Sequence, residues 1–152
     1  MKATELMIGD YVKFKGDIYI FEEISAQGWV HLIYPDTGIR VNIISDYIMH
    51  LLESVPLTPE ILKLNGFNEC STEVYTYRIE HETDISVYFS PNAKEDESKI
   101  VVSINSLSLH KDGSNLLHTC DIKYVHEFQH ALKLLKLNNL ADTFKIKNNH
   151  GL

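Results

Sequence analysis

The chain has 152 residues and a formal net charge of −7, with 44% hydrophobic and 23% charged residues. This composition is typical of a soluble globular protein of one ordinary domain or two small ones, and it argues against intrinsic disorder. The longest apolar runs are far too short to span a bilayer, so no membrane association is expected. The two cysteines, Cys70 and Cys120, form neither a disulfide framework nor a C-x-x-C motif. We therefore expect a cytoplasmic protein with reduced thiols.

The acidic charge is unevenly distributed along the chain. Residues 121–152 carry five basic and three acidic groups, whereas the segments before them are acidic. Nucleic-acid binders usually present a basic face, because neutralising phosphates releases counterions. Four lysines of this segment are more typical of a solvated surface, so nucleic-acid binding is disfavoured. They are Lys133, Lys136, Lys145 and Lys147.

The first fifty residues are predicted to form short β-strands. Apolar and polar residues alternate in residues 11–15, 18–24, 29–34 and 39–44, which is typical of strands that bury one face. Turn-forming residues separate these segments. Four or five short strands at this spacing predict a small SH3-like antiparallel barrel over residues 1–55.

The clearest helix signal is the stretch "TPEILKLNG", which covers residues 58–66. Thr58 is a favourable N-cap, and Pro59 suits the first helical position. Asn65 and Gly66 supply residues that tolerate the left-handed backbone at a helix end. The sequence therefore predicts a short helix between two β-rich segments.

The second half is predicted to form an antiparallel β-meander. Residues 73–80, 85–90 and 99–109 alternate with period two. The Asp112-Gly113 dipeptide is typical of a tight hairpin turn and leads into a further strand at residues 115–122. A main helix from the region of Asp121 to Leu137 should follow, and "ADTFKI" predicts a final short strand. The expected fold class is α+β, with a domain of residues 56–152 in which the meander packs against this C-terminal helix.

The predicted helix contains the run His126-Glu127-Phe128-Gln129-His130, which satisfies the H-E-x-x-H pattern of zinc peptidases. Two histidines at i and i+4 project from one helix face, where they can share a zinc ion. The glutamate can then act as general base on a metal-bound water. A zinc-dependent hydrolase that uses His126, His130 and Glu127 is therefore an alternative.

Two features of the same helix argue against zinc. Lys136 stands where the extended pattern requires a third histidine, and no glutamate follows Glu127. At about 100° per residue, the two histidines point almost opposite to the apolar face and are expected to be exposed to solvent. That apolar face contains Tyr124, Phe128, Ala131, Leu132 and Leu135.

The sequence contains no phosphate loop, dinucleotide fingerprint or calcium-loop spacing, so no cofactor is expected. His118 and Cys120 would lie on one face of a strand, where a thiol and its base could meet. A cysteine flanked by apolar residues is more often part of the core. We therefore expect no catalytic residues.

Aromatic residues on the predicted barrel strands offer a binding surface instead. Tyr11, Tyr19 and Trp29 need not all fit inside so small a core. Rigid aromatic side chains contribute much of the binding energy at protein interfaces. The alternative is that these rings pack within the protein.

Three stretches together carry a resemblance to a known family: "IGDYVKF", "VPLTPEILKLNGF" and "IKYVHEFQHAL". They resemble an uncharacterised family of small bacterial and prophage-encoded proteins. The resemblance covers most of the chain and implies an SH3-like N-terminal half and an α+β C-terminal half. It implies no activity. The family's helix has the pattern Y-V-H-x-L-Q, in which the position of His130 has no part.

These observations together predict a non-enzymatic, cytoplasmic binding module. Its partner would be a protein bound through the barrel face, at Tyr11, Tyr19 and Trp29, or through the C-terminal helix. Homo-oligomerisation is left open by the sequence.

Overall fold

The computed structural model describes residues 6–44, 50–80, 83–89, 100–106 and 116–147. The fold class is α+β, with two five-stranded antiparallel sheets and a few short helices. The chain divides into two compact units. One contains Met1–Pro56 together with Tyr124–Leu152, and the other contains Leu57–Lys123.

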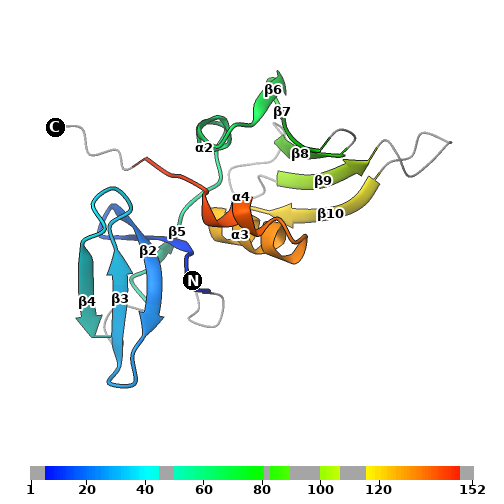
Figure 1. Cartoon of the computed structure of the whole chain (residues 1–152). Coiled ribbons are helices and arrows are strands. Elements are labelled where there is room, and N and C mark those ends of the chain that lie inside the picture. The colour runs from blue at the N-terminus through cyan, green and yellow to red at the C-terminus, as the bar shows by residue number, and fades with distance from the viewer. Residues whose placement is uncertain (1–5, 45–49, 81–82, 90–99, 107–115, 148–152) are drawn as a thin grey trace. The chain divides into compact units, whose positions relative to one another are not determined.

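The sheet of the first unit has the strand order β4-β3-β2-β1-β5 (Figure 1). Its strands are β1 (Tyr11–Phe14), β2 (Asp17–Ile24), β3 (Trp29–Ile33), β4 (Arg40–Ile44) and β5 (Glu53–Ser54). The first four strands were predicted within one or two residues, because apolar and polar residues alternate along their sequences. The two-residue β5 has no such pattern and was not predicted.

The strand β2 is shared between two neighbours. Its first half pairs with β1 and its second half with β3, and a register shift between Phe21 and Glu23 interrupts the second pairing. A β-bulge of this kind bends a strand and increases its twist. Among the described residues the sheet does not close into a barrel, since β4 and β5 each pair with one strand.

The inner face of this sheet forms a hydrophobic core. Val12, Val30 and Leu32 have no exposed surface at all. Burial of side chains of this size stabilises a fold by about 1.5–3 kcal/mol each. Phe14, Tyr19, Phe21 and Leu52 complete the cluster, and Val41 and Ile43 of β4 pack against it while only half-buried.

The second unit contains the predicted meander. Its sheet has the order β10-β9-β8-β7-β6. The strands are β6 (Asn68–Ser71), β7 (Val74–Glu80), β8 (Thr83–Phe89), β9 (Ile100–Ser106) and β10 (Leu116–Ile122). The fully exposed β6 was not predicted, because it has no apolar face.

The short helix α2 (Pro59–Leu64) has the ends that its sequence predicts. The Oγ1 atom of Thr58 accepts a hydrogen bond from the backbone N–H of Ile61 at 3.4 Å. Gly66 has a φ of 82°, a backbone conformation that glycine adopts at no steric cost.

The C-terminal segment differs from its prediction in two respects. The main helix α3 spans Val125–Leu134, and a second helix, α4, spans Asn138–Asp142. The prediction of a strand in "ADTFKI" is wrong, since Ala141 and Asp142 are helical and residues 143–147 form no strand. The alternation that suggested a strand is still physical, because Phe144 and Ile146 are buried while Lys145 is exposed.

The helix α3 also belongs to a different unit from the one expected. The sequence suggests a division into residues 1–55 and 56–152, which places this helix with the meander. The structure groups Tyr124–Leu152 with Met1–Pro56. The two chain segments of the first unit meet where the backbone N–H of Val125 donates to the carbonyl of Val55 at 2.9 Å, beside an antiparallel bridge between Pro56 and Tyr124.

Candidate functional site

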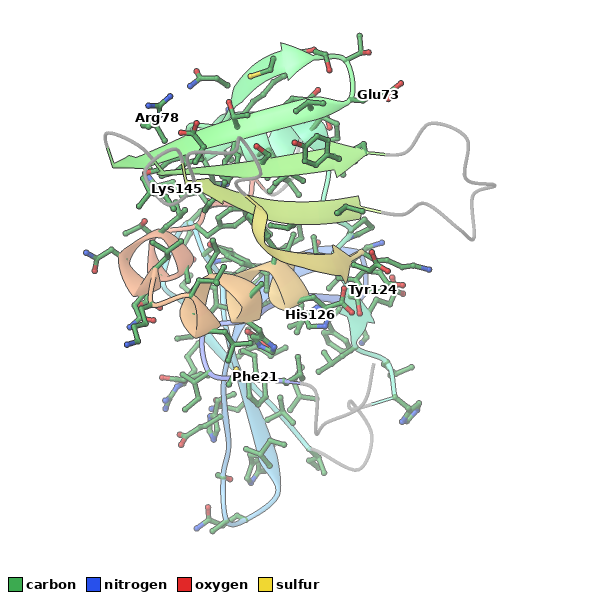
Figure 2. All side chains as sticks on the ribbon, turned by 90° about the vertical axis from the view of Figure 1, so that its right-hand side faces the viewer. Phe21, Glu73, Arg78, Tyr124, His126 and Lys145 are labelled. Atoms are coloured by element: carbon green, nitrogen blue, oxygen red, sulfur yellow. The ribbon has the colours of Figure 1, made fainter. Side chains whose placement is uncertain are left out.

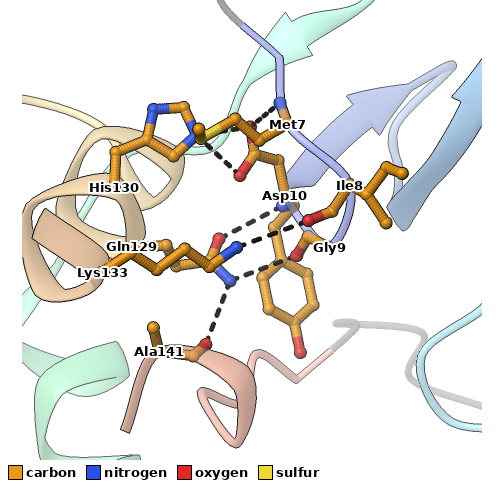
Figure 3. A network of polar contacts seen from close by, with 9 residues as sticks. Met7, Ile8, Gly9, Asp10, Gln129, His130, Lys133 and Ala141 are labelled. Atoms are coloured by element: carbon orange, nitrogen blue, oxygen red, sulfur yellow. Dashed lines mark hydrogen bonds and ion pairs between the residues drawn. The ribbon is translucent and has the colours of Figure 1, made fainter. Parts of the chain in front are cut away.

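A network of polar contacts lies where helix α3 meets the turn before β1 (Figure 3). This turn is closed by a hydrogen bond from the backbone N–H of Asp10 to the carbonyl of Met7 at 3.1 Å. Gly9 has a φ of 93°, which a residue with a side chain would adopt only under strain. Sequence and turn geometry together place the Asp10 side chain toward α3.

Asp10 is completely buried, which is rare for an aspartate. Its Oδ2 atom accepts the backbone N–H of Met7 at 2.7 Å. The Nε2 atom of His130 lies 2.9 Å from Oδ1 and 2.8 Å from Oδ2. A buried carboxylate is stable only when hydrogen bonds and an opposite charge compensate for lost hydration. His130, whose side chain is 24% exposed, is the side-chain partner of this carboxylate, beside the backbone N–H of Met7.

Gln129 binds the same turn from the next position on the helix. Its Nε2 atom donates to the carbonyls of Gly9 at 3.2 Å and Ala141 at 3.4 Å, and its Oε1 atom accepts the backbone N–H of Tyr11 at 3.4 Å. Gln129 is only 2% exposed. One side chain thus joins β1, α3 and α4.

Lys133 follows one helical turn after Gln129. Its Nζ atom donates to the carbonyl of Ile8 at 3.4 Å. One of the four lysines considered as a nucleic-acid contact is therefore engaged with the protein's own backbone. Gln129, His130 and Lys133 together form a polar clamp on residues 7–11.

The remaining residues of the H-E-x-x-H run also contact the protein itself. The Oε2 atom of Glu127 accepts the backbone N–H of Tyr124 at 3.1 Å, as a carboxylate does at a helix N-terminus. His126 lies in the first turn of α3 (Figure 2), with its ring stacked on Tyr124 at a centroid distance of 5.8 Å. The ring of His126 also meets that of His130 edge-on at 5.9 Å.

The expectation that both histidines are exposed to solvent is wrong. His126 is 4% exposed, and His130 reaches into the unit to Asp10. The apolar face was identified correctly, since Phe128 and Leu132 are completely buried. The helix is buried on a second side as well, and a calculation from its own sequence cannot reveal that side. Within the part of the chain that the structure describes, no three His, Cys, Asp or Glu side chains are grouped to hold a metal ion.

Two of the three predicted binding aromatics are buried. Tyr11 is 6% exposed, and its hydroxyl donates to the carbonyl of Phe144 at 2.7 Å. Burial, with a contribution from the charge of Asp36, raises the pKa of Tyr11. Tyr19 is 5% exposed and donates to the hydroxyl of Tyr34 at 2.7 Å. Burial and this hydrogen bond raise the pKa of Tyr19.

Trp29 is the predicted aromatic whose ring lies at the surface, with 40% of the residue exposed. It pairs across β3 and β4 with Ile44, which is 55% exposed. Because Val30 and Leu32 face the core, the alternate residues of these strands form the opposite, outer face. We define the outer face as Trp29, His31, Ile33, Arg40, Asn42 and Ile44.

Polar contacts hold the outer face in place. The Nδ1 atom of His31 and the Oδ1 atom of Asn42 are 2.7 Å apart. Arg40 binds Glu22, and its second guanidinium nitrogen lies 3.7 Å from Glu23. The hydrogen bond to Glu22 raises the pKa of Arg40, and the same bond lowers the pKa of Glu22.

The other sequence candidates are not brought together in the described structure. Cys70 is an exposed free thiol on β6. His118 and Cys120 lie on β10, but their side chains are outside the described residues. No helix in the described part of the chain has the length and apolar content that crossing a membrane requires.

The sequence reasoning missed Asp10 and Gln129. Asp10 sits in a short turn motif whose side-chain direction depends on a helix 120 positions away. The available signal was Gln129, a polar residue close to the apolar positions Phe128 and Leu132 of the same helix. That position could have indicated a buried polar contact. Comparison with protein-family models, curated proteins and solved structures finds no match to this chain.

Proposed function

We propose that this protein is a non-enzymatic binding module that contacts a protein partner through the outer face around Trp29. The observation that carries the proposal is the exposed Trp29–Ile44 pair on the outer face of the first sheet. Tryptophan is strongly enriched among the residues that dominate interface energetics. A ring held on a strand also loses little conformational entropy on binding.

The geometry of the H-E-x-x-H run supports a structural rather than a catalytic role for these residues of α3. His130 binds Asp10, Glu127 binds the helix N-terminus, and both contacts stabilise the first unit. The positions of the Y-V-H-x-L-Q pattern have the same character, since Val125, His126 and Gln129 are all buried. The burial of these residues explains their presence through the stability of the fold, without a catalytic role.

We further propose that the N-terminal sheet is a partly open SH3-like barrel whose β4 edge, among the described residues, does not close, and that the protein is cytoplasmic and prophage-related. The sharing of the bent strand β2 and the return of β5 to β1 support the barrel, because both features curve a sheet toward closure. The three stretches quoted above support the prophage-related origin. Phage genes flanking the coding sequence would test that origin, and a chromosomal housekeeping context would contradict it.

Comparative affinity capture tests the binding proposal. Wild-type protein, Trp29→Ala and Tyr88→Ala are used as bait in extracts of cells that naturally produce the protein. Tyr88 is the matched control, because it is exposed to nearly the same extent (39%) but lies on β8 of the second unit.

A partner of the outer face should be depleted at least about tenfold with Trp29→Ala and retained with Tyr88→Ala. Circular dichroism of each variant establishes that the fold is intact. If the set of captured proteins is the same with all three baits, binding through Trp29 is wrong.

A further inference from the structure

The four sheet edges of the described structure differ in how they are protected against pairing. The strand β5 has only two residues, and register shifts interrupt the pairing of β6 and of β10. The strand β4 pairs with β3 over five residues without a shift. Natural edge strands avoid association through short length, bulges, proline or charge. The strand β4 is not shortened to two residues, has no bulge and contains no proline.

The single charge on β4 is already compensated. Arg40 is bound to Glu22 and lies close to Glu23, so it does not present an unpaired cation to an incoming strand. The other side chains of β4 are Val41, Asn42, Ile43 and Ile44. The edge is therefore regular, neutralised and largely apolar.

The direction of the β4 backbone groups follows from three hydrogen bonds at the two ends of the β3–β4 hairpin. Trp29 donates its N–H to the Oγ atom of Ser25 and accepts the N–H of Ser25, so its backbone points toward β2. At the other end of the hairpin, the N–H of Tyr34 donates to the carbonyl of Ile39. Antiparallel pairs alternate between hydrogen-bonded and non-hydrogen-bonded.

Both ends give the same result for β4. The backbone groups of Val41 and Ile43 face β3, while those of Arg40, Asn42 and Ile44 face the open edge. Three N–H groups and three carbonyls are thus directed away from the sheet, and within the described residues no strand pairs with them.

We propose that β4 pairs antiparallel with β4 of a second copy of this chain, centred on Asn42. In this register Asn42 lies opposite the partner's Asn42, and Arg40 lies opposite the partner's Ile44. All three outward-facing residues of each strand are then hydrogen-bonded pairs. The two sheets become one continuous sheet across the interface.

The side chains favour the same register. On the core side, Val41 comes to lie opposite the partner's Ile43, and both residues are only half-buried in the single chain. On the outer face, no arginine lies opposite another arginine, so direct like-charge repulsion is avoided. A parallel arrangement in register would place the two Arg40 side chains side by side. The strand is therefore complementary to itself in one orientation.

This inference does not depend on the protein partner proposed for Trp29. Pairing through β4 uses backbone groups at the sheet edge, whereas the proposed partner contacts the indole ring on the outer face. Trp29→Ala should therefore leave the dimer intact, and failure of one proposal does not decide the other.

Sedimentation equilibrium of the full chain tests the dimer. Wild-type protein should show a concentration-dependent dimer. Asn42→Pro should weaken dimerisation at least about tenfold, because proline removes the central edge N–H while remaining tolerated on an edge strand. Asn42→Ala is the matched control, since it also loses the contact to His31 but keeps the N–H. It should dimerise like the wild type.

A second pair of variants keeps the test informative if proline unfolds the strand. Ile44 is exposed and is placed opposite the partner's Arg40. Ile44→Lys should weaken the dimer several-fold, and Ile44→Glu should dimerise more tightly than Ile44→Lys. A wild-type chain that stays monomeric into the millimolar range overturns the proposal, as does equal dimerisation of the lysine and glutamate variants. The proposal is also wrong if the protein stays monomeric and binds an extended segment of another protein.

Discussion

The imidazole of His130 lies within 2.9 Å of both carboxylate oxygens of Asp10, although the two residues are 120 positions apart in sequence. This pair joins α3 to the turn that starts the N-terminal sheet. Asp10 has no exposed surface, so its carboxylate depends on partners from the protein, which are His130 and the backbone N–H of Met7. The relationship explains why the last part of the chain belongs to the same unit as the first.

Removing either member of this pair should therefore be costly. We expect His130→Ala to lower the free energy of unfolding by about 3 kcal/mol, because it removes the side-chain partner of a buried carboxylate. The double variant Asp10→Asn/His130→Ala should cost less than the sum of the single variants, because the buried charge is gone. Urea denaturation of Asp10→Asn, His130→Ala and the double variant measures the three free energies of unfolding. His31→Ala, on the exposed face, is the control and should cost at most about 1 kcal/mol.

Gln129 should contribute about as much to the free energy of unfolding as the contact between Asp10 and His130. Gln129→Ala removes partners from the backbone groups of Gly9, Tyr11 and Ala141, and each buried group left unpaired costs about 1–3 kcal/mol. We expect a total loss of about 3 kcal/mol in denaturant unfolding. Lys133→Ala removes one partly exposed contact and should change stability by less than about 0.5 kcal/mol. Equal effects of the two substitutions would contradict this assignment.

Hydrogen exchange can test the division of the chain. If α3 is part of the first unit, amides of β1 and α3 should open with the same free energy. Gln129→Ala should then accelerate exchange in Tyr11–Phe14 and in Val125–Leu134 alike, while amides of β8 keep their protection. Acceleration shared by α3 and β8 but not β1 would instead support a domain of residues 56–152.

A single substitution after α3 should stabilise the protein. Lys136 has a φ of 62° and follows the last turn of the helix, where Leu137 donates its N–H to the carbonyl of Leu132. Glycine adopts this backbone conformation without the cost of about 1 kcal/mol that a side chain imposes. Lys136→Gly should therefore raise the thermal midpoint. Lys133→Gly, inside the helix, should lower it by a comparable amount.

Alkaline pH should unfold the first unit through its buried tyrosines. The pKa of Tyr11 is raised above its ordinary value of 10.0 by burial, and that of Tyr19 is raised by burial as well. Their contribution to stability is complete below the unfolded-state pKa and is lost as the pH rises toward the folded-state pKa. Tyr11→Phe should flatten this alkaline loss of stability.

At neutral pH the same substitution should lower the stability of the protein. Tyr11→Phe removes the hydrogen bond to the carbonyl of Phe144 and should cost about 1 kcal/mol there. Urea midpoints measured from neutral to alkaline pH should therefore converge or cross for wild type and variant. A constant difference across this range would show that Tyr11 does not contribute to the alkaline transition.

Local signals in the sequence were enough to predict most elements. The helix α2 begins after Thr58 and ends at Asn65-Gly66 as expected, because capping depends on residues within one turn. The long strands were predicted because apolar and polar residues alternate along their sequences. The short strands β5 and β6 lack that alternation and are formed by pairing with neighbours that only the fold supplies.

The α+β class, the main strands and the apolar face of α3 can thus be predicted from local sequence patterns. What the other faces of that helix contact becomes visible only in the folded unit. Gln129, His130 and Lys133 have the polarity of surface residues, and nothing near them in sequence distinguishes a clamp from a solvated face. The distinction depends on a turn at residues 7–11 that is brought to the helix by folding. Periodicity reports which residues avoid water, whereas the partner of a polar side chain is set by contacts between distant segments.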